Sequence, residues 1–174
     1  MLLRDLVEIS RKVSLTSRKK EKVLLIASLL SRLRGGEVRL AASYLSGRIP
    51  QGRLGIGWRM MEEALRDLPR REGPLYFLEV DRFFDEIASQ RGAGSLERKI
   101  RALREMLSRA RDEEQRFLSS LIMGEMRQGA LEGLVLEAIG KASGLPQERI
   151  RQAFMFSGDV GEVARAAIEL SLIH

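Results

Sequence analysis

The chain has 174 residues, of which 44% are hydrophobic, 30 are lysine or arginine and 24 are aspartate or glutamate. A chain of this length can bury the core of one domain without disulfides, and the absence of cysteine excludes disulfides and thiolate metal sites. The chain has one histidine, which argues against histidine catalysis and histidine metal sites. No apolar run is long enough to span a bilayer, so we expect a cytoplasmic protein without a membrane segment.

Apolar side chains recur at helical spacing along almost the whole chain. Val23, Ile26 and Leu30, for example, fall on one helical face, and no long stretch alternates apolar with polar side chains. We therefore predict an all-α fold of about ten to twelve short helices, with Ser95 as the N-cap of one of them. In chain order, the predicted helices cover about residues 1–12, 18–34, 38–45, 58–68, 80–87, 96–111, 117–122, 131–139, 147–155 and 159–172.

The phrase Gly-x-[Ile/Met]-x-Gln-Gly occurs twice, 77 residues apart, over residues 47–52 and 124–129. Matches at the same offset continue outside the phrase and include Lys22 with Lys99, Arg39 with Arg116, and Phe77 with Phe154. Fixed-offset matches over half a chain indicate two copies of one helical unit. We predict a single domain, residues 1–174, with internal repeats at approximately 17–90 and 94–167 that are related by an approximate two-fold.

Each phrase places one glycine at the end of a predicted helix and another at the start of the next. Gly47 and Gly124 can adopt the left-handed conformation that ends a helix. Gly52 and Gly129 are predicted to lie where free helix amides and the absent Cβ admit a phosphate. The candidate side chains around them are Arg48, Arg53, Arg127, Gln51, Gln128 and, from the basic run 18–22, Lys20. The alternative is that the glycines only permit tight turns between packed helices.

Two such loops related by a two-fold match the two antiparallel strands of a nucleic-acid duplex, which has a two-fold of its own. Each loop can hold one strand, and no predicted helix carries a row of Asn, Gln and Arg aimed at base edges, so contacts are expected on phosphate and sugar. Binding is then independent of sequence and weakened by salt. A scaffold of helical repeats that binds a replication or repair protein is the alternative function.

Three other features favour a structural interpretation. Gly55-Ile56-Gly57 lacks the third glycine and the preceding strand of a dinucleotide site, so we interpret it as a flexible entry into the helix of Trp58. The acidic run 112–114 suits the positive end of a helix dipole better than a metal. Tyr44, Trp58 and Tyr76 are expected in the core or an interface rather than stacked on bases. No catalytic residue and no metal ligand is predicted.

Three stretches, residues 44–58, 117–133 and 155–161, closely resemble the N-terminal DNA-binding domain of ATP-dependent DNA ligases, in particular its bacterial and archaeal branch. The most specific string is Gly-Glu-Met-Arg-Gln-Gly-Ala-Leu-Glu-Gly over residues 124–133. The resemblance covers nearly the whole chain and implies an all-helical, pseudo-symmetric module that grips the minor groove around a nick through backbone amides of glycine-containing loops. On this resemblance, the phosphate-contacting positions are Gly124, Arg127, Gln128 and Gly129, with Gly47 and Gly52 as their first-copy counterparts.

The resemblance also concerns the chemistry of the parent enzyme. The nucleophile of the family is the lysine of Lys-x-Asp-Gly, and none of the six lysines here is followed by x-Asp-Gly. We therefore expect these residues neither to self-adenylate nor to seal DNA, and to need no cofactor. The parent ligase is expected to use ATP and Mg²⁺ in DNA replication, repair and recombination, with adenylation and OB-fold domains closing round nicked double-stranded DNA. We expect a nucleoid-associated monomer without membrane contact.

Overall fold

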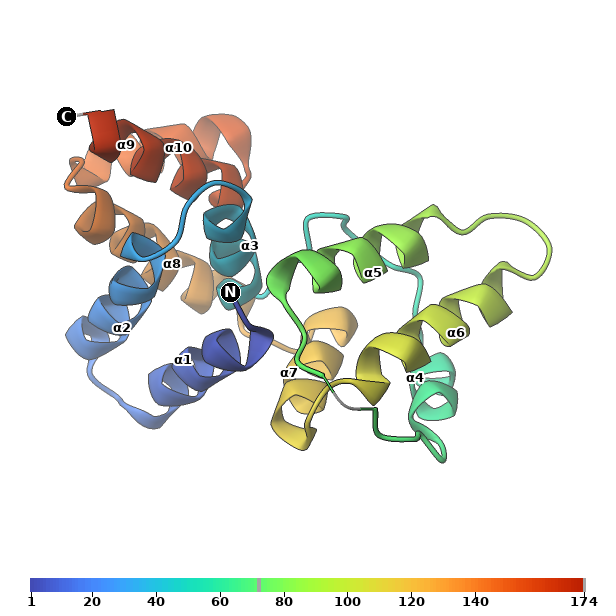
Figure 1. The fold of residues 1–174 in the computed structure, drawn as a ribbon. Coiled ribbons are helices and arrows are strands. Elements are labelled where there is room, and N and C mark those ends of the chain that lie inside the picture. Colours follow the sequence, from blue (N-terminus) through green and yellow to red (C-terminus); the bar gives the residue numbers. More distant parts are fainter. Residues whose placement is uncertain (72, 174) are drawn as a thin grey trace. The chain divides into compact units, whose positions relative to one another are not determined.

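A computed structural model describes residues 1–71 and 73–173, and it describes Gln128 and Gly129 by their backbone alone. Within these residues the fold consists of ten α-helices and contains no sheet (Figure 1), which confirms the prediction of an all-α fold. The helices are α1 (Leu3–Leu15), α2 (Lys19–Ser31), α3 (Gly36–Leu45), α4 (Trp58–Leu65), α5 (Phe77–Ser89), α6 (Ser95–Ser108), α7 (Asp112–Met123), α8 (Gln128–Ser143), α9 (Gln147–Ser157) and α10 (Val160–Ile173).

The helices form two compact units, and each unit is assembled from separate segments of the chain. Unit 1 comprises residues 1–7 and 51–125, and unit 2 comprises residues 8–50 and 126–174. Unit 1 therefore holds α4 to α7, whereas α2, α3 and α8 to α10 belong to unit 2. Each unit takes helices from both halves of the sequence, so neither coincides with one predicted repeat, and the repeat relation stays a prediction.

In unit 1, α6 packs against both α4 and α5. Phe77 and Phe84 of α5 and Leu103 of α6 are fully buried, and each such side chain stabilises the fold by about 1.5–3 kcal/mol relative to an exposed one. The start of the chain adds to this core, because the backbone N–H of Leu3 donates to the carbonyl of Leu75 at 2.8 Å. The segment that precedes α5 is thereby held in place by the N-terminus.

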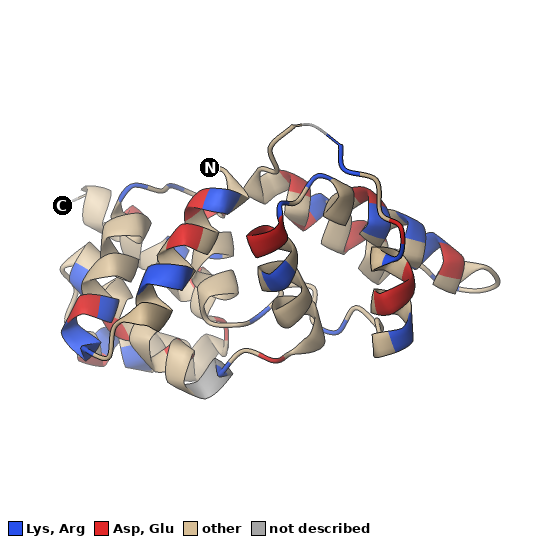
Figure 2. Cartoon of the chain, turned by 90° about the horizontal axis from the view of Figure 1, so that it is seen from below, with Lys and Arg blue, Asp and Glu red and all other residues tan. Residues whose placement is uncertain are grey.

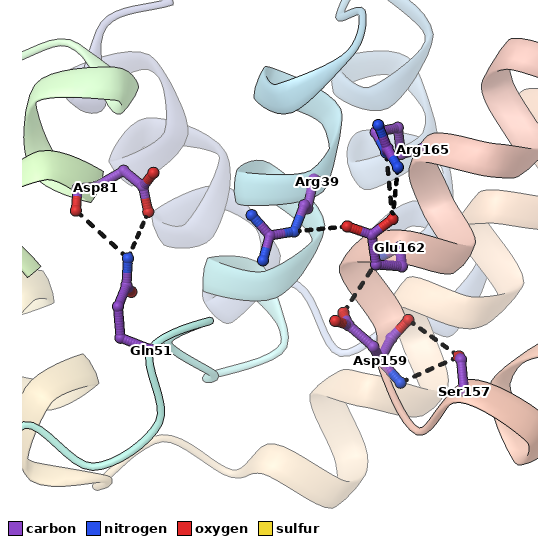
Figure 3. Close-up of polar contacts among 7 residues, drawn as sticks. All are labelled: Arg39, Gln51, Asp81, Ser157, Asp159, Glu162 and Arg165. Atoms are coloured by element: carbon purple, nitrogen blue, oxygen red, sulfur yellow. Dashed lines mark hydrogen bonds and ion pairs between the residues drawn. The ribbon is translucent and has the colours of Figure 1, made fainter. Parts of the chain in front are cut away.

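In unit 2, α8 packs against α2 and α10, and α10 packs against α3. Gly161 allows α10 to approach α3, because a Cβ there would lie 2.4 Å from Ser43 Oγ and 2.7 Å from the Arg39 carbonyl oxygen. The start of α10 is capped by Asp159, whose Oδ1 accepts a hydrogen bond from Glu162 N at 3.1 Å (Figure 3). The string over residues 155–161 therefore has a structural role at the start of α10.

Several helix ends follow the predicted glycines. Gly124 and Gly144 are the C-caps of α7 and α8 with φ of 68° and 74°, and Gly47, just after α3, has φ of 80°. The prediction of left-handed glycines at the helix ends is confirmed for Gly47 and Gly124. The prediction of Ser95 as an N-cap is wrong: Gly94, with φ of 77°, is the N-cap and Ser95 is the first residue of α6. Because Gly94 adopts the left-handed conformation, α6 begins at Ser95, one residue before the predicted start.

Three helices end three residues before their predicted limits, one of which is the helix predicted over 96–111, which ends at Ser108. The helix predicted over 18–34 ends at Ser31, because the amide of Arg32 bonds three residues back to the carbonyl of Leu29 in a tightened last turn. The helix predicted over 58–68 ends at Leu65, and Asp67 has φ of 49°, which no right-handed helix accommodates.

Candidate nucleic-acid interface

The loop between α7 and α8 leaves a helix start without a side-chain cap. After Gly124, the amide of Glu125 donates to the carbonyl of Ser120 at 2.9 Å and completes the turn that ends α7. The N-cap of α8 is Arg127, which makes no side-chain capping hydrogen bond. Because the first amides of a helix have no intrahelical acceptor and lie at the positive end of its dipole, this start can bind an anion.

Arg127 and Lys22 supply positive charge near this helix start. Both line one cavity of about 400 Å³ in unit 2, together with Ser10 and Ser14 of α1 and Leu131 of α8. Arg127 is exposed, and no ion pair of its guanidinium occurs among the residues that the structure describes. Lys22 belongs to the basic run 18–22, from which the sequence analysis selected only Lys20 as a candidate site residue. The predicted roles of the Gln128 side chain and of Gly129 lie outside the described residues.

The first loop begins as predicted, but its arginine is tied to the protein. Gly47 N donates to the carbonyl of Tyr44 at 3.0 Å, and Arg48 N donates to that of Ser43 at 2.9 Å, so the turn closes on α3. Arg48 Nε lies 2.7 Å from Glu132 Oε2 of α8, and its side chain is 49% exposed. One edge of the guanidinium is therefore paired within unit 2, and the other nitrogens remain candidates for a phosphate.

The prediction that Gly52 opens the next helix is wrong. Gly52 and Gly55 have φ of 80° and 70°, outside the right-handed helical region, and α4 begins only at Trp58. Side chains from elsewhere in unit 1 hold the intervening segment: Lys99 Nζ donates to the carbonyl of Leu54 at 2.7 Å. Leu54 is buried, and the segment before Trp58 is not helical.

Gln51 takes part in the same anchoring. Its Nε2 donates to Asp81 Oδ1 at 2.7 Å, as Figure 3 shows, and to Asp85 Oδ1 at 2.7 Å. These contacts bind the amide group to α5, so the Gln51 nitrogen is not a free donor for a phosphate. Gln51 therefore holds the loop against α5, and its side-chain nitrogen is no longer a candidate for a direct phosphate contact.

In this copy the uncapped helix start lies at Gly57. Gly57 is the N-cap of α4 with φ of −99° and ψ of 178°, and no side chain caps the helix. No heavy atom comes within 4 Å of the position that a Cβ would occupy, so the backbone is open to a ligand. Arg53 and Arg59 are exposed on either side. The sequence signal was Gly55-Ile56-Gly57 directly before a helix, which had been interpreted only as a flexible entry.

Lys20 and the neighbouring basic side chains differ in what they contact. Lys19 Nζ lies 2.7 Å from Glu137 Oε1, and Arg18 lies 3.5 Å from Glu21, whereas Lys20 is exposed with no ion pair among the described residues. Lysine and arginine side chains are interleaved with acidic ones over the helices of both units (Figure 2). Within this run, Lys20 and Lys22 therefore have no acidic partner among the described residues.

The aromatic side chains do not all follow the expectation. Tyr44 is fully buried in the core, whereas Trp58 is 61% exposed and Tyr76 is 48% exposed, so these two do not lie in the core, and their place in an interface stays a prediction. Trp58 is the first residue of α4, and its ring therefore lies in solvent at the uncapped helix start.

Neither metal ligands nor a membrane segment were found in the described part of the chain. No three carboxylate or imidazole side chains there converge as ligands. The acidic run 112–114 forms the first turn of α7, where Glu114 Oε1 accepts a hydrogen bond from Arg111 N at 3.2 Å and Asp112 pairs with Arg70. None of the described helices combines the length and the apolar character that crossing a bilayer requires.

Comparison with known proteins identifies relatives along almost the whole chain. The family model of the DNA ligase N terminus matches residues 58–140. A probable DNA ligase of Anaeromyxobacter dehalogenans is 44% identical over 170 residues, which is 97% of this chain and 33% of the relative. Probable DNA ligases of Saccharopolyspora erythraea and Nocardia farcinica are 44% and 40% identical over 168 residues. The chain spans about a third of the length of these relatives.

Proposed function

Because the chain belongs to the family of DNA ligase N-terminal domains, we propose that it binds duplex DNA around a nick through phosphate contacts that are independent of base sequence. The observation that carries the proposal is the uncapped start of α8 with the exposed Arg127 at its N-cap. Helix amides bind a phosphate oxygen, and the guanidinium fork fits a second one. Lys22, which lines the same cavity as Arg127, adds a further positive charge.

The start of α4 is the proposed contact of the first copy. Gly57 leaves room for a phosphate, and Arg53 and Arg59 are exposed on either side of it. Gly47 and Gly52 have positive φ, and Gln51 is bound to α5, so we assign these residues to shaping the loop. Contacts from backbone amides and arginines fall on phosphate, which fits the minor-groove binding that the family resemblance implies.

Within a longer ligase, this chain is proposed to hold the nicked duplex while other domains perform the chemistry. Its six lysines lack the Lys-x-Asp-Gly sequence, so ATP, Mg²⁺ and the reactive lysine are assigned to adenylation and OB-fold domains outside these 174 residues. Incubation with radiolabelled ATP and Mg²⁺ is expected to leave the protein unlabelled. A stable lysyl-adenylate on any of the six lysines would contradict this division of labour.

Fluorescence anisotropy with nicked and intact duplexes tests DNA binding. If each loop neutralises about three phosphates, the logarithm of the association constant should fall with log[salt] at a slope of about −5. The substitution Arg127→Gln should weaken binding to all sequences and reduce the slope by about 1. Arg151→Gln, which removes an exposed arginine of α9, is the matched control and should leave the slope unchanged.

The same titration separates this function from a protein-binding scaffold. A backbone contact responds steeply to salt and little to sequence, whereas an apolar protein contact barely responds to salt. Nicked and intact duplexes of any sequence should bind within about tenfold of each other. Phosphate contacts do not read the base sequence, and nick sensing is assigned to the other domains of the ligase. A strong preference for one base sequence, or no binding at low salt, would refute the proposal.

A further inference from the structure

A second cationic site lies in unit 1, around the turn that joins α6 to α7. A cavity of about 570 Å³ opens there between the first turn of α1, the segment that precedes α5, and this turn. Its volume is within the usual range for pockets that bind small molecules. Among the residues that the structure describes, five arginines and one carboxylate carry the charge of its lining: Arg4, Arg70, Arg71, Arg109, Arg111 and Glu114.

Two of these arginines are held in place by the protein. Arg109 donates from Nη1 to Glu79 Oε2 at 2.6 Å and from Nη2 to the carbonyl of Pro74 at 2.7 Å. The hydrogen bond from Arg109 lowers the pKa of the Glu79 carboxyl, so this pair stays charged at neutral pH. Arg70 pairs with Asp112. These contacts build the wall of the cavity and neutralise two of its five positive charges.

The other three arginines carry unbalanced charge. Within residues 1–71 and 73–173, the guanidinium groups of Arg4, Arg71 and Arg111 take part in no ion pair and no side-chain hydrogen bond. The backbone beside them is nevertheless fixed, because Arg71 N donates to the carbonyl of Ser108 at 2.9 Å. Three guanidinium forks thus lie around one cavity on an ordered backbone.

We propose that this cavity binds an oligophosphate, that is, two or more linked phosphate groups. Glu114, which is 6% exposed and accepts a hydrogen bond from Arg111 N, offsets one of the three free positive charges. An excess of about two charges matches the charge of linked phosphates better than that of a singly charged anion. The cavity of about 570 Å³ has room for a chain of phosphates. It is too small for a DNA duplex, whose major groove alone is about 12 Å wide.

The proposed oligophosphate site and the proposed DNA contact at the start of α8 share no lining residue. The residues that line the arginine cavity belong to unit 1, whereas Arg127 and Lys22 belong to unit 2. Variants of the two sites can therefore be tested independently of each other.

The test is isothermal titration of the 174-residue protein at constant ionic strength with tripolyphosphate, pyrophosphate, orthophosphate and sulfate. Affinity should fall in that order, with at least about a tenfold difference between tripolyphosphate and orthophosphate. Arg71→Gln and Arg111→Gln should each weaken tripolyphosphate binding by about tenfold or more. Arg151→Gln, a charge-matched substitution in unit 2, and Arg127→Gln at the DNA loop should leave it unchanged. Thermal melts of each variant confirm that it is folded.

Two further titrations identify the source of the phosphates. If ATP binds like tripolyphosphate and AMP binds weakly, the cavity recognises the phosphate chain alone, and tighter binding of ATP than of tripolyphosphate assigns it to nucleotides. Either result supports the oligophosphate proposal. Equal affinity for tripolyphosphate and sulfate would overturn it, and so would an equal loss in Arg71→Gln and Arg151→Gln. Displacement of tripolyphosphate by one equivalent of duplex DNA would also overturn it, since the arginines would then belong to the DNA surface.

Discussion

The substitution Gly57→Asp should change stability and DNA affinity in opposite directions. Gly57 is the N-cap of α4, and its φ of −99° and ψ of 178° suit any residue. An aspartate there can accept hydrogen bonds from the first helix amides, which no side chain does in the parent. The gain consists of a few tenths of a kcal/mol from capping, about 0.3–1 kcal/mol from the dipole and about 0.4–1 kcal/mol from loss of glycine flexibility in the unfolded chain.

Together these contributions amount to roughly 1–2 kcal/mol of added stability, and no clash opposes them because no heavy atom lies within 4 Å of the new Cβ. For a chain of this size, 1 kcal/mol corresponds to a rise in Tm of about 2–4 °C. The same carboxylate occupies the amides that we assign to a phosphate and repels it. Loss of one charge-assisted contact costs about 1.5–3 kcal/mol, which weakens DNA binding by roughly ten- to a hundredfold.

The assay combines thermal melts with fluorescence anisotropy on a nicked duplex at low salt. Gly57→Asn is the matched control, since asparagine caps the helix about as well as aspartate but carries no charge. It should stabilise the protein similarly and weaken DNA binding less than aspartate does. If Gly57→Asp melts at a higher temperature and binds DNA as tightly as the parent, the start of α4 does not contact a phosphate.

Three further substitutions test the structure around the candidate site. Gly52→Asp should lower stability by about 1 kcal/mol or more, because φ is 80° there, while the folded protein keeps its DNA affinity within about threefold because Gly52 is not at a helix start. Gly161→Ala should cost about 1–3 kcal/mol, since its Cβ would clash with Ser43 Oγ at 2.4 Å, and a thermal melt equal to that of the parent would contradict the close packing of α3 and α10. Glu79→Gln tests the pair with Arg109: the lowered pKa of Glu79 means that the pair stabilises the fold above about pH 4.3 and loses this effect as the pH falls through the lowered pKa. The Tm difference between parent and variant should therefore be present at neutral pH and shrink in acid, and a difference that does not depend on pH would refute the ion pair.

Local signals in the sequence determined the helical class and many helix ends. Apolar side chains at helical spacing predicted helices that the structure confirms, because a helix needs only an apolar face and a few end signals within its own residues. Gly47 and Gly124 ended their helices as predicted, since a positive φ is a local property that glycine alone adopts without strain. The family resemblance rested on the same loops, and the comparisons confirm it.

The conformation of the first loop depended on contacts that the repeat pattern does not reveal. Gln51 bonds to Asp81, 30 residues away, and Lys99 bonds to the carbonyl of Leu54, 45 residues away. These contacts hold residues 51–57 in a non-helical path and move the helix start from Gly52 to Gly57. The helix predicted over 58–68 begins at Trp58 as predicted, whereas matching the two copies by residue identity placed the free helix amides at Gly52, five residues before the N-cap Gly57.

The grouping of helices and charges was likewise decided by tertiary structure. Each compact unit joins helices from both halves of the sequence, because a helix buries its apolar face against whichever partner the chain path brings near. Arg4, Arg71 and Arg111 are far apart in the sequence and line one cavity only after the first turn of α1, the segment before α5 and the turn after α6 have come together in unit 1. The sequence by itself determined the helices, the glycine turns and the family, whereas the position of the free helix starts and the arginine cavity depended on long-range packing, which no local pattern encodes.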